Sequence, residues 1–214
     1  MLEHNHYERA TAAWLRARGT AFVPVHEGQR AHRGGSQPAD SVKSPDFLVL
    51  GTGGRSYVVD VKGRRFPAGK GRGPCNGSVA QPGPWEKVGQ ASGSTGGRNV
   101  FECWVTLDDL DGLARWTTRL GKDWSGLFLF AYWLADGLVT TGDMPDLYEF
   151  QGRQYLFRGA LLEEFRAGMR VRSPRWATVD LPVRESRRVI RPLHSMRGLE
   201  SLGEVGRRDC ARLA

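Results

Sequence analysis

The sequence predicts an α/β domain built on a mixed central sheet. Three observations support this: an amphipathic helix near the N-terminus, a hairpin of two β-rich segments after it, and a second helix followed by a continuously apolar strand. Helices with an apolar stripe and sheets with an apolar face bury these surfaces against each other. A chain of 214 residues is long enough for one such domain with a substantial core.

The first helix is indicated by its apolar periodicity. The stripe repeats at positions i, i+3, i+4, i+7 and i+8, which are Tyr7, Ala10, Thr11, Trp14 and Leu15. Gly19 follows the stripe, as expected of a glycine that ends a helix. Residues 21–25 are short, apolar and β-branched, and they predict the first strand.

A β-hairpin is predicted next, because residues 45–50 and 55–62 are rich in β-branched and aromatic side chains and a glycine-rich turn separates them. The turn sets the register. If the loop is residues 52–54, with glycine in the left-handed position, Leu48 pairs with Val58. A loop one residue shorter would shift the register and put paired side chains on opposite faces.

The predicted register places two acidic residues opposite each other, Asp46 and Asp60. Opposed residues lie only ~5 Å apart on one face, and Lys62 shares the face of Asp60. The alternate residues Tyr57, Val59 and Val61 are expected in the core.

Two opposed carboxylates destabilise a sheet unless a cation lies between them. Mg²⁺ suits such a site, because it prefers carboxylate oxygens and keeps waters for the substrate. A bound metal would lower the pKa of a water and polarise a phosphate, and Lys62 would stabilise developing negative charge. The alternative is a surface hairpin on which Asp60 and Lys62 are solvated charges. The paired Pro45-Asp46 favours the site.

Pro45-Asp46, Asp60-x-Lys62 and an upstream helical glutamate, Glu8, resemble the PD-(D/E)xK nucleases. This superfamily includes many restriction endonucleases and archaeal Holliday-junction resolvases. The resemblance covers roughly residues 6–64 and implies a restriction-endonuclease-like αβββαβ core. It implies Asp46, Asp60 and the Val61 carbonyl as metal ligands and Lys62 as the catalytic lysine.

The same resemblance implies Glu8 as a further metal or water ligand. On a helical wheel Glu8 lies at the edge of the apolar stripe, from which it could point along the sheet. Its alternative role is a first-turn glutamate favoured by the helix dipole. The opening His6-Tyr7-Glu8-x-Ala10 also resembles an uncharacterised bacterial group named for a His-Tyr-Glu-x-Ala-Phe-Glu start. Thr11 and Ala12 replace its Phe-Glu, so any role of the second glutamate is missing.

The remaining elements follow from periodicity and turn signals. A helix is predicted over residues 107–120, and Asp108, Asp109 and Asp111 at its start are interpreted as solvated groups that compensate the helix dipole. Residues 126–134 predict a strand buried on both faces. The other predicted elements are a strand or an extended entry at 100–106, a hairpin of 147–150 with 155–158 around Gly152, a helix at 160–167 and a short strand at 176–181.

Basic residues gather in two regions. A glycine-rich loop is predicted over residues 63–99, where Arg64 and Arg65 are placed to clamp a nucleic-acid backbone. Arg172 and Arg175 in the C-terminal part are further candidates for nucleic-acid binding. Trp176 beside them suits either base stacking or packing within a strand. Residues 1–185 are predicted to form the single nuclease-like domain, and residues 186–214 a basic, mobile tail.

Charge and composition limit the class of protein. The formal net charge of +8 favours a polyanionic partner. The resemblance to nucleases implies nucleic acid, with DNA preferred to RNA. The three cysteines are odd in number and far apart, which gives neither a disulfide framework nor a zinc motif and suits a reducing cytoplasm. No apolar run approaches ~18 residues, so no membrane span is expected. A homodimer would suit the cutting of two strands, although no residue indicates one.

The sequence therefore predicts an endonuclease that hydrolyses DNA phosphodiester bonds with Mg²⁺ or Mn²⁺. Two alternatives remain. A non-catalytic nucleic-acid-binding module that kept the fold would bind with a steep salt dependence and no metal-dependent cleavage. A protein-interaction domain using the arginine-rich C-terminal part would keep its partner in the presence of DNA.

Overall fold

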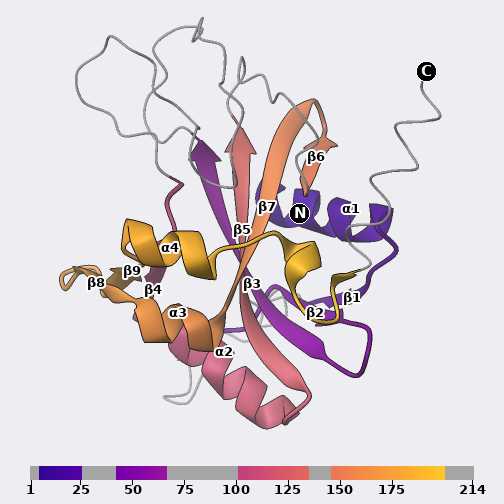
Figure 1. Cartoon of the computed structure of the whole chain (residues 1–214). Helices are drawn as coiled ribbons and strands as arrows, with labels where there is room; N and C mark the ends of the chain where they lie inside the picture. Colours follow the sequence, from indigo (N-terminus) through magenta and orange to yellow (C-terminus); the bar gives the residue numbers. More distant parts are fainter. Residues whose placement is uncertain (1–4, 26–41, 67–100, 135–145, 201–214) are drawn as a thin grey trace, which may run out of the picture.

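A computed structural model describes residues 5–25, 42–66, 101–134 and 146–200 of the chain. Its centre is a six-stranded sheet in the order β1-β2-β3-β5-β7-β6 (Figure 1). Strands β3 and β5 are parallel, and every other neighbouring pair in this sheet is antiparallel. The fold is thus α/β with a mixed central sheet, as the sequence predicts. The strands of this sheet are β1 (Ala21–Pro24), β2 (Phe47–Leu50), β3 (Ser56–Phe66), β5 (Trp124–Leu134), β6 (Leu147–Phe150) and β7 (Arg153–Leu161).

Helices cover both faces of the sheet. Helix α1 (His6–Ala17) packs on one face, and α2 (Leu107–Leu120) and α3 (Leu162–Gly168) pack on the other (Figure 1). A small second sheet of order β4-β9-β8 lies beside the start of α2. Its strands are β4 (Val105–Thr106), β8 (Arg170–Ser173) and β9 (Thr178–Asp180). In the described part of the chain, no helix is long and apolar enough to cross a membrane.

The β2–β3 hairpin has the predicted register. Leu48 pairs with Val58 and Phe47 with Val59, and the turn places Gly53 and Gly54 at positive φ values of 66° and 76°. These backbone angles are easily adopted only by glycine. The glycine pair therefore determines which side chains of β3 share a face.

Alternation along β3 divides its side chains between the two cores. Tyr57 and Val59 are buried in the core beneath α1, whereas Val58 is buried in the core beneath α2. Gly63 lies under the ring of Tyr7, where an added Cβ would meet ring carbons at 2.1–2.6 Å. The absence of a side chain at this position allows the start of α1 to lie directly on β3.

Several element boundaries differ from prediction. Strand β3 continues to Phe66, so residues 63–66 are not part of a loop. The extension is stabilised by pairing with β5 as far as Phe66↔Leu134. Residues 160–161 end β7 instead of beginning a helix. Among the described residues 101–106, strand pairing is confined to 105–106, and the residues before them form the extended entry that the sequence also allows. Residues 67–99 lie outside the described part of the chain.

The segment 186–200 differs from the expected mobile tail. It contains the end of α4 (Val183–Val189) and a 3₁₀ turn, η2 (Leu193–Ser195). Its apolar side chains are buried, and Gly159 of β7 leaves the space for them, because a Cβ there would meet Leu193 and Met196 within 3 Å. The arginines around these apolar residues hide their periodicity in the sequence. Residues 201–214 lie outside the described part.

Candidate functional site

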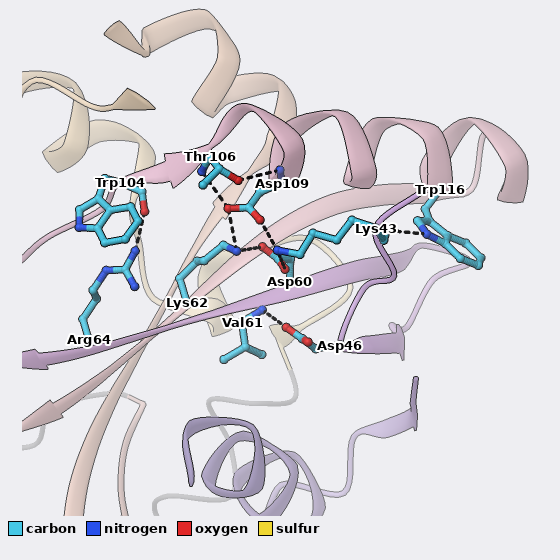
Figure 2. A network of polar contacts seen from close by, with 10 residues as sticks. All are labelled: Lys43, Asp46, Asp60, Val61, Lys62, Arg64, Trp104, Thr106, Asp109 and Trp116. Carbon is cyan, nitrogen blue, oxygen red and sulfur yellow. Dashed lines mark hydrogen bonds and ion pairs between the residues drawn. The ribbon is translucent and has the colours of Figure 1, made fainter. Parts of the chain in front are cut away.

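The site lies where β2 separates from β3. The last pair of the ladder is Phe47↔Val59, and the Asp46 N–H donates to the Val59 carbonyl at 2.9 Å. One oxygen of the Asp46 carboxylate accepts the Val61 N–H at 2.6 Å. Figure 2 shows this carboxylate directed at the Val61 amide, on the other side of the β3 ribbon from Asp60 and Lys62.

This geometry corrects one expectation. The predicted register holds for residues 47–50, but the pairing ends before Asp46 and Asp60, and the two carboxylates do not face each other. The reason is that Asp46 has already left the ladder, so its side chain can turn to the backbone amide between Asp60 and Lys62. The Asp46 carboxylate nevertheless binds β3 at the amide of the residue between Asp60 and Lys62.

Asp60 and Lys62 point to the opposite side, toward the start of α2. Asp60 is only 4 % exposed, and its carboxylate lies 2.5 Å from the Lys62 amine. The same amine lies 2.9 Å from the carboxylate of Asp109. Lys43 pairs with Asp109 and lies 3.8 Å from Asp60. Two lysines and two aspartates thus form one network of alternating charge (Figure 2).

Asp109 is not the solvated group that the sequence indicates. It is 5 % exposed and forms a capping box with Thr106, in which the Asp109 N–H donates to the Thr106 hydroxyl and the Thr106 N–H donates to the Asp109 carboxylate. The first turn of α2 packs against β3, so this position faces the sheet. Its neighbours Asp108 and Asp111 are exposed, as predicted. The capping pattern Thr106-x-x-Asp109 is a signal in the sequence, but it says nothing about the partner across the sheet.

Lys43 is the other residue that sequence reasoning missed. The Trp116 indole N–H donates to the Lys43 carbonyl at 3.0 Å, which ties the segment before Asp46 to α2. Gly112 allows this approach, because a Cβ there would meet Lys43 at 3.2 Å. Lys43 lies only three residues before Asp46, and this proximity is the available sequence signal.

Negative charge accumulates around Asp46. Burial raises the pKa of Asp46 to about 7, and the charges of Asp60 and Glu8 add to this, against the opposing effects of the Val61 amide and Lys62. Glu8, half-buried on α1, is therefore close enough to act on Asp46, as the predicted site requires. Burial also raises the pKa of Asp60, although Lys62 and Lys43 oppose the shift.

The raised pKa of Asp46 predicts a pH-dependent stability when divalent cations are removed with EDTA. Between about pH 4 and pH 7 the folded protein holds a proton on Asp46 that the unfolded chain has released. This contribution to the free energy of unfolding is present at low pH and is lost as the pH rises through 7. We expect Asp46→Asn to unfold like the wild type at pH 4.5 and to be more stable by at least about 1 kcal/mol at pH 8. Urea unfolding at the two pH values would measure this, and equal destabilisation at both would contradict it.

The donor chemistry at this point fits a hard divalent cation. Mg²⁺ is commonly bound by one or two carboxylates together with waters and substrate phosphates. Asp46 and Asp60 supply the carboxylates, with Glu8 nearby. Within residues 5–25, 42–66, 101–134 and 146–200, no three histidine, cysteine or acidic side chains are grouped closely enough to hold a metal ion by themselves.

Two of the residues predicted to contact nucleic acid, Arg64 and Arg172, approach the same tryptophan ring although they are far apart in the sequence. Arg64 lies on β3 two residues after Lys62, with its guanidinium 3.9 Å from the centre of the Trp104 ring, and it donates to the Trp104 carbonyl at 2.7 Å. Arg172 of β8 lies 5.4 Å from the same ring centre. Arg65 is directed elsewhere, over Trp133 at 5.3 Å. Arg175 lies 5.0 Å from the ring of Trp176.

The sequence of this chain matches no protein-family model and no curated protein. The arrangement itself provides two carboxylates at a strand fork, a lysine held between two aspartates and an arginine-rich flank. Such a set can bind a cation, stabilise negative charge and contact a phosphate backbone.

Proposed function

We propose that this protein is a metal-dependent nuclease that hydrolyses DNA phosphodiester bonds. One observation carries the proposal: the Asp46 carboxylate binds the amide between Asp60 and Lys62, which joins all three residues at the fork of two strands. The order of elements along the chain is α1-β1-β2-β3-β4-α2-β5, and β4 belongs to the small second sheet. Without β4, this order supports a restriction-endonuclease-like αβββαβ core and membership of the PD-(D/E)xK nucleases.

Asp46 and Asp60 would hold Mg²⁺ or Mn²⁺, assisted by the Val61 carbonyl and Glu8. When bound, the ion would lower the pKa of a coordinated water and polarise the phosphate. Asp46 and Glu8 are held near each other by the packing of α1 on β3, which brings Tyr7 onto Gly63. The packing thereby keeps Asp46 near Glu8, whereas the Asp60 carboxylate lies on the other side of β3.

Lys62 is the residue best placed to stabilise negative charge on the reacting phosphate. Its side chain is 11 % exposed, and its amine is held between Asp60 and Asp109. An ammonium fixed in a partly buried site stabilises developing charge more strongly than one in water, because its position costs no reorganisation during the reaction. Asp109 is the residue that orients it.

The net charge of +8 supports a nucleic-acid substrate, and so do Arg64 and Arg172, whose guanidinium groups both lie against the ring of Trp104. A second function is favoured by the network itself: Lys43 and Lys62 neutralise Asp60 and Asp109 without a metal. A module that keeps this network permanently would bind nucleic acid without cutting it.

The deciding experiment incubates the purified protein with supercoiled plasmid and with single-stranded DNA in Mg²⁺, Mn²⁺ or EDTA. We expect cleavage that requires metal and falls by at least ~100-fold in Asp60→Asn, since one carboxylate ligand is lost. Asp108→Asn makes the same change at an exposed position near the site and should cut normally. Binding without cleavage in every metal would favour the non-catalytic module. Metal-independent cleavage that persists in Asp60→Asn would reveal a contaminating nuclease.

A further inference from the structure

The hairpin of β8 and β9 presents an exposed tryptophan among arginines. Trp176 lies in the turn between the two strands, outside the strand that the sequence predicts for it, and is 67 % exposed. Arg172 and Arg175 are also exposed on this hairpin. Exposure at this level excludes the role of Trp176 as a core residue and leaves the stacking role open.

The arginines give this surface its charge preference. The guanidinium of Arg175 lies 5.0 Å from the Trp176 ring centre, so cation and aromatic ring are presented together. Arg172 is exposed beside Trp104, with one contact at 3.4 Å to Glu102. An aromatic surface surrounded by arginines suits a nucleic-acid strand, whose bases stack and whose phosphates are negative.

The hairpin is fixed to the candidate site through the start of α2. The Leu107 N–H donates to the Ala177 carbonyl at 2.9 Å, and Thr106 of β4 pairs with Thr178 of β9. Thr106 is also the N-cap residue that binds Asp109, which holds Lys62. The tryptophan turn and the catalytic lysine are therefore attached to the same helix start.

A second connection runs along β3. Arg64 lies two residues after Lys62 and binds Trp104, and Arg172 of the hairpin approaches the same ring. Basic residues therefore lead from Lys62 in the site, through Arg64, to Arg172 on the hairpin.

We propose that the β8–β9 hairpin binds an unpaired stretch of nucleic acid, with a base stacked on Trp176 and phosphates bound by Arg172 and Arg175. The inference rests on the proposed function, for which it names the substrate class: a strand with exposed bases, as in single-stranded DNA or an unpaired flank. A base inside a duplex has both faces covered by its neighbours, so it offers no face to Trp176.

The test measures binding in EDTA, where cleavage does not interfere. Fluorescence anisotropy with a labelled oligothymidine and with a duplex of equal length gives both affinities. We expect Trp176→Ala to weaken single-strand binding by about 10-fold and duplex binding much less. Trp176→Phe should restore most of the affinity, because a phenyl ring still stacks. Unchanged single-strand binding, or equal losses for both DNA forms, would overturn the proposal.

The arginines are tested by salt dependence. The double variant Arg172→Ala with Arg175→Ala should lower the slope of log affinity against log salt by about 1.4 for single strands. The matched control, Arg115→Ala with Arg119→Ala, removes the same charge from exposed positions on α2 and should leave the slope nearly unchanged. Equal effects of the two pairs would mean that only net charge matters and would contradict a hairpin site.

Failure of this inference is distinguishable from failure of the proposed function. If metal-dependent cleavage occurs but Trp176→Ala binds normally, the hairpin proposal is wrong and the nuclease stands. If no metal gives cleavage but Trp176→Ala loses binding, the hairpin stands and the nuclease is wrong.

Discussion

Changing Lys62 to methionine is expected to reduce metal-dependent cleavage by about 10²–10³-fold, the loss typical of removing one preorganised group that stabilises transition-state charge. The methylene chain of methionine fills much of the same space, whereas the ammonium is gone. Plasmid nicking under single-turnover conditions, at saturating protein and Mg²⁺, would measure the loss in the chemical step.

Lys43→Met is the matched control, because Lys43 belongs to the same network and carries the same charge. Lys43 is 43 % exposed and contacts Asp60 at 3.8 Å, compared with 2.5 Å for Lys62. We therefore expect a loss of ~10-fold or less. Equal losses in the two variants would indicate that the network needs total positive charge, and would contradict a specific role of Lys62.

The Lys62→Met variant could lose cleavage in two ways, through weaker metal binding or through loss of the ammonium in the reaction, and the two are measured separately. Removing Lys62 leaves buried Asp60 with a weaker counter-charge, which further raises the pKa of that carboxyl and opposes metal binding. The Mg²⁺-dependent rise in melting temperature reports this binding directly. A Lys62→Met protein that keeps the rise but does not cut would place the defect in the reaction and not in metal affinity.

Changing Asp109 to alanine is expected to lower the free energy of unfolding by roughly 3–5 kcal/mol, the range for breaking a buried ion pair from one side. The Lys62 amine would keep an ion pair with Asp60 only, and α2 would lose its capping box. Urea unfolding at pH 7 would measure the loss. Asp111→Ala, at an exposed position of the same helix, should change stability by less than about 1 kcal/mol.

The pH dependence gives a second readout for Asp109. Burial alone would raise its pKa, but Lys62, Lys43 and the Thr106 amide outweigh burial and lower the pKa to about 2. A carboxyl with a depressed folded-state pKa contributes stability above its unfolded pKa, and this is lost as the pH falls from about 4 to about 2. The difference between the wild type and Asp109→Ala should therefore shrink over this window. A difference that stays constant down to pH 2 would show that the ionised carboxylate is not the stabilising group.

The sequence by itself determined the elements built from local rules. The glycine pair at 53–54 specified the hairpin register, and with it the division of Tyr57 and Val58 between two cores. The apolar stripe of α1 and the continuous apolar run of β5 predicted an amphipathic helix and a strand buried on both faces. Each of these depends on side-chain periodicity within a single segment, which is visible in the chain itself.

Only the tertiary structure decided which charged groups meet. Asp109 is a helix-start aspartate by sequence, but the packing of α2 on β3 buries it against Lys62 and brings Lys43 to the same place. Asp46 turns away from Asp60 because β2 separates from β3 one residue earlier than the paired register suggests. The exposure of Trp176 depends on where the β8–β9 turn lies on the surface. Lys43 and Asp109 are 66 residues apart in the sequence. Contacts over such separations depend on how the helices and the sheet pack together, and the periodicity within one segment does not specify that packing.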